Sequence, residues 1–277
     1  VFINTYGDRR MTKSATRVSA DKVTFTQTEV TSAVALKAPI ASPVFTGNVG
    51  IGATPESTNI HSSYTSVDIS RGGAIAGHSA GNGIKILGNA YRTTSGYAYK
   101  NTDKVSLYAN DDGIHQFAVA ASGTADAAIS WNTAMTIDNA GIVTKPYQPA
   151  FRACKDTGDT SSTGYIVWNA SKINVGGHYS TSTGKFTAPV AGNYYFAVRA
   201  LTASATQNNI WIGINHNGNS VLQTYHSHIN HSNISGEAVI TMAANDYVQT
   251  YWGGTGSIHT GGTNHHIYSF FQGHLIG

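Results

Sequence analysis

Charged residues are scarce in this chain of 277 residues. Asp, Glu, Lys and Arg make up 11% of it, and the formal net charge is only +3. Helical proteins commonly use charged pairs spaced four residues apart, so this scarcity argues against a helical bundle. The sequence contains no run of Lys and Arg that would form a basic patch for binding phosphates. We therefore expect no nucleic-acid partner.

Cysteine and long apolar runs are also nearly missing. The single cysteine, Cys154, excludes a disulfide within the chain, and its surroundings favour a small buried apolar residue over a nucleophile. The longest apolar runs fall far short of the roughly 18 residues that a membrane helix needs, so we expect no membrane insertion. The opening residues, Val1 to Asn4, do not resemble a signal peptide. Stability must therefore come from packing and from partner subunits.

What the chain has in excess is small polar residues. Ser, Thr, Asn and Gly make up about two-fifths of the sequence, and they are neutral to poor in helix interiors. The hydrophobic share of 40% and the aromatic share of 10% are sufficient for a folded core, which excludes general disorder. The composition therefore predicts an all-β protein with many short strands and small-residue turns.

Residues 1–47 hold the densest Lys and Arg, and we interpret them as an N-terminal attachment and stalk segment. Within them, residues 29–37 place apolar side chains at helical spacing before Pro39 ends the pattern. A nine-residue helix is not stable alone. The segment is thus either a short helical stalk shared by three chains or a packed surface turn.

Residues 48–146 are interrupted by glycine every several residues. Short alternating runs recur between these interruptions, at residues 84–87, 105–108, 117–120 and 135–138. Such thin strands bury little apolar area within one chain, so we expect this region to pack against copies of itself as a β-rich, intertwined shaft. Pro146 and Pro149 then mark a linker.

Residues 150–277 are richer in large aromatic side chains and alternate more clearly. Tyr194, Phe196 and Val198 share one strand face, and residues 210–214 alternate isoleucine with other residues. Asn217-Gly218 is a strong hairpin signal. Further strands are predicted at 238–242, 247–252 and 267–276. Regular strand spacing of this kind is typical of a sandwich or jelly roll.

Three blocks of this region resemble the globular head domain of complement C1q. Residues 174–196 contain Asn-Val-Gly-Gly-His-Tyr, Thr-Gly-Lys-Phe-Thr-Ala-Pro and Gly-Asn-Tyr-Tyr-Phe. Residues 238–248 and 271–275 follow in the family's order and spacing. Asn245 replaces the usual glycine, and Gln272 and His274 also depart from the pattern. The resemblance implies a C1q/TNF-like jelly-roll head that assembles as a tight trimer, with Phe186, Tyr194, Phe196 and Phe271 filling one core.

The front of the chain resembles a different family. Residues 35–52 and 134–141 are similar to the connector repeats of bacteriophage tail fibres. Joined to a trimeric jelly roll, they imply a homotrimeric phage tail fibre or receptor-binding protein of the virion. Its N-terminal segment would attach to the tail or baseplate, and its head would adhere to a host cell-surface glycan. The alternatives are a secreted C1q-like adhesin and a tail-associated polysaccharide depolymerase.

Enzymatic motifs are few. Residues 77–81 match the Gly-x-Ser-x-Gly nucleophile elbow, which requires a strand before the serine and a helix after it. The glycines and asparagine that follow favour a loop instead. Glycan hydrolysis requires two carboxylates about 5–10 Å apart, and the head offers few. They are Asp156, Asp159, Glu237 and Asp246. We therefore expect no catalytic residues, no cofactor and no enzymatic activity.

Aromatic and histidine side chains near Gly/Ser-rich turns are the best binding candidates. Flat rings beside polar donors suit sugar rings, although many of these rings could equally pack in the core. The predicted receptor-binding residues are Tyr225, His226, His228, Tyr251, Trp252 and His259. His226 and His228 also point the same way on a strand. Around a threefold axis they would give six imidazoles for a transition metal, the alternative being ordinary surface or intersubunit histidines.

Overall fold

The computed structural model describes residues 45–56, 60–156, 163–203, 207–259 and 265–277. The all-β prediction is confirmed, because strands dominate and the described residues contain a single four-residue helix, α3 (His265–Tyr268). No helix in these described ranges is long and apolar enough to cross a membrane. The predicted N-terminal helix or turn at 29–37 lies outside them, as does most of the proposed stalk.

The chain divides into two compact units. One comprises the described residues up to Gly113 together with Val119–Trp131, and the other comprises Ile114–Ala118 with Asn132–Gly277. The predicted boundaries at residues 47 and 146 stay predictions. We call the eight-stranded sheet formed before residue 146 the front sheet, and residues 150–277 the head.

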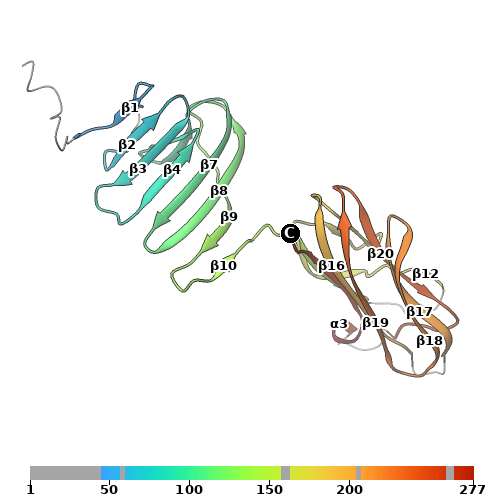
Figure 1. Ribbon diagram of the computed structural model, residues 1–277. Coiled ribbons are helices and arrows are strands. Elements are labelled where there is room, and N and C mark those ends of the chain that lie inside the picture. The colour runs from blue at the N-terminus through green and yellow to red at the C-terminus, as the bar shows by residue number, and fades with distance from the viewer. Residues whose placement is uncertain (1–44, 57–59, 157–162, 204–206, 260–264) are drawn as a thin grey trace, which may run out of the picture. The chain divides into compact units, whose positions relative to one another are not determined.

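The front sheet is mostly an antiparallel meander, in which strands follow one another in chain order (Figure 1). The four alternating runs predicted from the sequence lie in β4, β7, β8 and β9. The strands in sheet order are β1 (Val49–Ile51), β2 (Tyr64–Ile69), β3 (Gly73–His78), β4 (Ile84–Gly88), β7 (Asp103–Asp111), β8 (Ile114–Gly123), β9 (Asn132–Ile137) and β10 (Val143–Thr144).

One face of the front sheet is covered by the hairpin of β5 (Ala90–Thr93) and β6 (Gly96–Tyr99), which contacts β3 and β7. Two buried tyrosines of this hairpin are anchored by hydrogen bonds. The hydroxyl of Tyr99 donates to the carbonyl oxygen of Ala121 (2.6 Å), and the hydroxyl of Tyr91 donates to Asp126 Oδ1 (2.8 Å). Small side chains fill the space between hairpin and sheet, so this core is thin.

The predicted loop at residues 77–81 is confirmed only after His78, because Gly77 and His78 still belong to β3. His78 ends β3, and the next regular element is β4 rather than a helix. A nucleophile elbow requires a strand-to-helix turn, so this strand–turn–strand segment does not present Ser79 as one.

The head is a jelly roll of two sheets. The first sheet has the order β13 (Ala170–Val175), β11 (Ala150–Cys154), β21 (Phe270–Leu275), β16 (Gly192–Leu201) and β19 (Asn233–Met242). The second has the order β14 (Tyr179–Ser180), β15 (Lys185–Thr187), β20 (Tyr247–Gly253), β17 (Gln207–His216) and β18 (Asn219–Ile229), with β12 (Gly164–Tyr165) also pairing with β20. Strands distant in sequence are neighbours in both sheets, as the predicted jelly roll requires.

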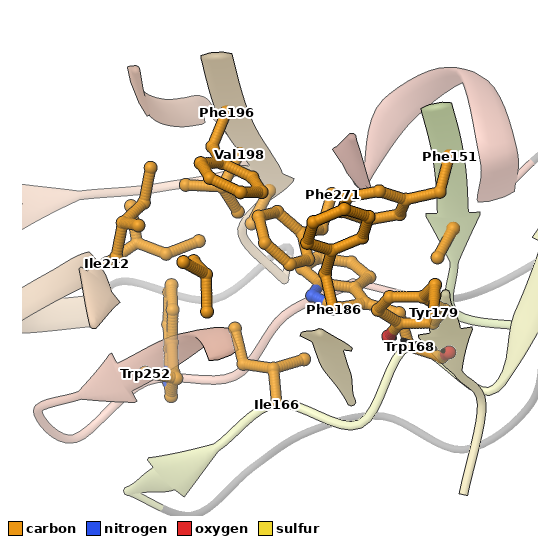
Figure 2. Packing of buried hydrophobic residues seen from close by; sticks show 14 of the residues in the cluster. Phe151, Ile166, Trp168, Tyr179, Phe186, Phe196, Val198, Ile212, Trp252 and Phe271 are labelled. Carbon is orange, nitrogen blue, oxygen red and sulfur yellow. Dashed lines mark hydrogen bonds between the residues drawn. The ribbon is translucent and has the colours of Figure 1, made fainter. Parts of the chain in front are cut away.

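Stacked aromatic rings fill the core of the head (Figure 2). Phe151 stacks on Phe186 with centroids 4.9 Å apart and meets Phe271 edge-on at 4.9 Å. Gly273 leaves room for this packing, since a Cβ there would lie 2.5 Å from the ring of Phe196. The predicted core of four aromatic residues is confirmed, and so is the inward face of β16.

The predicted hairpin at Asn217-Gly218 connects β17 and β18. Both residues have positive φ, 50° and 86°, which is the geometry that favours Asn-Gly in two-residue hairpins. The Asn217 side chain also ties the turn to the start of β20. Its Nδ2 donates to Asp246 Oδ1 (2.7 Å), and its Oδ1 accepts from the backbone N–H of Tyr247 (2.9 Å).

Candidate ligand-binding surface

Trp252 was predicted to bind a receptor, and the structure shows this to be wrong. Its side chain is fully buried in the head core (Figure 2), and its Nε1 donates to the carbonyl oxygen of Gly256 (2.9 Å). Alternation along β20 explains the error, because Val248, Thr250 and Trp252 all face inward. A side chain without exposed surface offers nothing to a ligand.

Tyr251 and Tyr225 lie on the outer face of the second sheet, together with two aromatic residues that the sequence analysis missed. The rings follow four adjacent strands, β12, β20, β17 and β18. Tyr165 pairs with Tyr251 in register, and Trp211 pairs with Tyr225. We call this set the aromatic row: Tyr165, Tyr251, Trp211 and Tyr225.

Three rings of the aromatic row contact one another, and Tyr225 is the cross-strand partner of Trp211. Trp211 stacks on Tyr251 with centroids 4.9 Å apart and an interplanar angle of 9°. Tyr251 in turn meets Tyr165 edge-on, with centroids 5.1 Å apart. Tyr165 is 45% exposed and Tyr225 is 59% exposed. The row therefore offers a half-buried, stacked centre with exposed rings at both ends.

Two glycines make space for the indole of Trp211. A Cβ at Gly253, its direct cross-strand partner, would lie 2.2 Å from Trp211 Cε2. A Cβ at Gly213 would lie 3.2 Å from Trp211 Cζ3. The ring therefore lies directly over the backbone at Gly253, in space that a side chain there would fill. Alternation of residues 210–214 was a signal that could have placed Trp211 on the outer face.

Polar groups border the aromatic row. The hydroxyl of Tyr225 donates to Asn209 Oδ1 (3.1 Å), and Asn215 Nδ2 lies 3.5 Å from the hydroxyl of Tyr165. Asn215 is 7% exposed, and its Oδ1 has no hydrogen-bond partner among the described residues. Buried amide oxygens normally have partners, so this end of the row carries an unused acceptor.

The predicted histidines do not join the aromatic row. His226 pairs with the buried Ile210 and is half-buried on the core side of β18, opposite to Tyr225. His228 is exposed, with its Nδ1 2.9 Å from Asn208 Oδ1. His259 lies outside the strands and contacts the ring of His231 at 5.4 Å. The six predicted residues are therefore spread over four places rather than one patch.

Metal binding within one chain finds no support from the described residues, which contain no group of three His, Cys, Asp or Glu able to hold an ion. The pair of His226 and His228 does share a strand face, as alternation required. A site completed by other copies of the chain stays a prediction.

The head carboxylates are engaged in structural hydrogen bonds. Asp246 accepts from Asn217, from the backbone N–H of Ala243 (2.8 Å) and from His216 Nε2 (3.0 Å), and these bonds lower its pKa below the usual value. Glu237 accepts from the hydroxyl of Tyr195 (2.7 Å). A glycosidase needs a carboxylic acid of raised pKa, and Asp246 is shifted the opposite way. Asp159 lies outside the described residues, while Asp156 is exposed.

Cys154 is buried in β11, and burial raises the pKa of its thiol. The reactive form of a cysteine is the thiolate, which this environment disfavours. The residue therefore packs as a small apolar side chain, as the sequence analysis expected.

Comparison with known proteins places residues 150–276 in the C1q domain family. Complement C1q tumor necrosis factor-related protein 3 of Mus musculus and of Homo sapiens are each 28% identical over 131 residues, which covers 47% of this chain and 51% of theirs. Protein 2 of the same series from Mus musculus is 35% identical over 77 residues, 27% of this chain and 25% of that protein. The chain thus spans about half the length of the curated relatives named first.

Among solved structures, the globular domain of zebrafish complement 1qA protein is similar at 21% identity and a TM-score of 0.37, covering 47% of this chain and 98% of that one. The head is a C1q domain, as its motifs predicted. The comparisons give no support to the bacteriophage tail fibre interpretation. They fit the alternative, a secreted C1q-like adhesin, better than a phage protein.

Proposed function

We propose that this protein is a secreted, non-enzymatic adhesin that binds glycans through the aromatic row of its C1q domain. The observation that carries the proposal is the stacked Trp211–Tyr251 pair on a solvent-facing sheet, extended by two exposed tyrosines. Aromatic rings with an apolar face and a polar edge are suited to partly apolar, hydroxyl-rich ligands.

The dimensions of the row favour a chain of sugars over a single ring. Neighbouring strands lie about 4.8 Å apart, so four adjacent strands span roughly 14 Å. Sugar rings would stack along this line, with hydroxyls reaching the exposed polar groups of Asn209 and of the Tyr165 hydroxyl at the two ends. A shallow, open surface of this kind gives weak binding per site.

We further propose that three copies of the chain assemble through their heads, as the resemblance to C1q heads implies. Weak single sites become effective when several are linked, because the second and third contacts are intramolecular. Adhesion by three identical sites requires no covalent chemistry, which agrees with carboxylates that serve as hydrogen-bond acceptors in turns and strands.

The test is a glycan microarray probed with the purified full chain, followed by calorimetry on the strongest binder. We expect Trp211→Ala and Tyr225→Ala each to weaken binding at least tenfold. The matched control is Tyr268→Ala, which removes an exposed tyrosine from α3 and leaves the row intact. Unchanged binding in both row variants would overturn the assigned site, and shortened polysaccharide products after incubation would overturn the non-enzymatic assignment.

A further inference from the structure

The front sheet carries apolar side chains on the face opposite to the one that the β5–β6 hairpin covers. Among the exposed large hydrophobic residues are Ile69 (41%), Ile84 (44%), Ile86 (48%) and Val119 (48%). Isolated exposed apolar residues are ordinary, whereas contiguous apolar patches mark interaction surfaces. The question is therefore whether these residues are contiguous.

The strand registers show that Ile69 and Ile86 belong to one patch, and Ile84 lies two residues from Ile86 on the same face of β4. One ladder runs across four strands, from Val49 to Val67, Ile75 and Ile86, each residue directly opposite the next. A second pair, Ile51 and Ile69, lies two residues along on the same face. Cross-strand partners have side chains in contact distance, so the ladder is a continuous apolar band. We call it the outer band.

Charge is distributed in the reverse of the usual way. Lys85, between Ile84 and Ile86, points to the covered face and forms an ion pair with Asp111. Asp68, between Val67 and Ile69, is 1% exposed and lies 3.3 Å from Lys100 Nζ. A sheet with one wetted face normally turns its polar residues to water. Here the same strands turn isoleucines to the open side.

Whereas the neighbouring β7 has Lys104 at an outward position, the outward positions of β2, β3 and β4 contain no charged residue. These positions are Thr65, Val67, Ile69, Gly73, Ile75, Gly77, Ile84, Ile86 and Gly88. In a symmetric assembly, each residue near the axis meets its own copy, so any charge there would face the same charge. An uncharged face is what contact between identical copies requires.

We infer that the outer band is buried against further copies of this same chain. The occupant is a second copy rather than a different protein because the band on β2, β3 and β4 has no charge with which to select an unlike partner. Assembly through the heads would raise the local concentration of the front sheets. Contact between the outer bands does not depend on whether the heads bind glycan.

Thiol labelling of the purified full chain tests this inference, because in that sample only the chain itself can cover the band. Ile86→Cys places a thiol on the outer band, and Ser95→Cys places the matched control in the exposed turn between β5 and β6. The native Cys154 is buried. We expect a maleimide to label the Ile86→Cys variant at least tenfold more slowly than the control, and dilution to remove the difference as copies separate.

A second variant separates self-contact from local rigidity. Ile86→Lys adds a charge to the band, and we expect it to accelerate labelling of a thiol introduced by Ile69→Cys, whereas Ser95→Lys leaves that rate unchanged. Equal labelling at the band and the control in a sample that sediments as an oligomer would overturn the inference. Protection in a sample that sediments as a monomer would also overturn it, because the cover would then come from the same chain, for example residues 1–44.

Discussion

The head and the front sheet distribute their large side chains in opposite ways. In the head, the aromatic core residues are buried within one chain, and Trp168, Phe186 and Phe196 have no exposed surface. In the front sheet, the covered face holds mainly alanine, leucine and two ion-paired charges, while isoleucines face outward. The head buries its large side chains within one chain, whereas the front sheet keeps isoleucines exposed on its outward face.

The largest expected effect comes from removing a core ring of the head. Phe196→Ala should destabilise the head by about 3–5 kcal/mol, because the cavity is surrounded by rings that cannot collapse into it. Leu87→Ala in the covered face of the front sheet should cost about 2–3 kcal/mol, near the lower end for leucine. Denaturant unfolding, followed by tyrosine and tryptophan fluorescence, measures both. A larger loss from Leu87→Ala would contradict the contrast between a thick and a thin core.

The next effect concerns the charges inside the front sheet. Asp68→Asn should destabilise this unit by about 3 kcal/mol, since Lys100 would keep its buried charge without a partner. Asp68 also accepts the backbone N–H of Glu56 (2.7 Å). Thermal unfolding monitored by circular dichroism checks the loss, with Asp103→Asn as the control at an exposed position. Equal melting temperatures for the two variants would show that the inner pair is dispensable.

A smaller effect is expected at the aromatic row. Gly253→Ala should cost about 1–3 kcal/mol, because the added Cβ would displace the Trp211 ring from the backbone of β20. The indole would leave its stacked position on Tyr251, so glycan binding should weaken as in Trp211→Ala. Gly47→Ala is the control, since nothing lies within 4 Å of a Cβ there. If the Gly253→Ala variant is destabilised but binds glycan as tightly as the parent chain, the aromatic row is not the glycan-binding site.

The sequence predicts the inward and outward faces of some strands better than those of others. Along β17, buried Ile210, Ile212 and Ile214 alternate with other residues, so both the strand and its outward Trp211 were within reach of a period-two pattern. Along β20, Gln249 and Thr250 are both buried, so polarity does not distinguish the two faces. The sequence therefore could not tell that Tyr251 faces out and Trp252 faces in.

The candidate site was harder to predict than the fold for a related reason. The aromatic row joins residues from four strands, and its members are far apart in sequence. Motif spacing identified the C1q domain because the turns and core positions lie close together along the chain. Cross-strand register, in contrast, depends on pairings that no local pattern encodes. The same limit explains why alternation detected the strands of the front sheet without showing that their isoleucines face outward.

The smallest expected effect is a pH dependence confined to the head. The pKa of Asp246 lies below its ordinary value of 3.8, chiefly because Asn217 and the backbone N–H of Ala243 donate to the carboxylate. A depressed folded-state pKa gives stability that is present above the unfolded value and is lost as the pH falls through the folded value. Melting temperatures should therefore fall below about pH 4 in the parent chain, and less so in Asp246→Asn. Asp156→Asn, at an exposed position, should keep the parent's acid response. If the melting temperature of Asp246→Asn falls at low pH as much as that of the parent chain, other groups cause the fall. The hydrogen bonds of Asp246 in the turn between β19 and β20 would then not contribute to the pH dependence of stability.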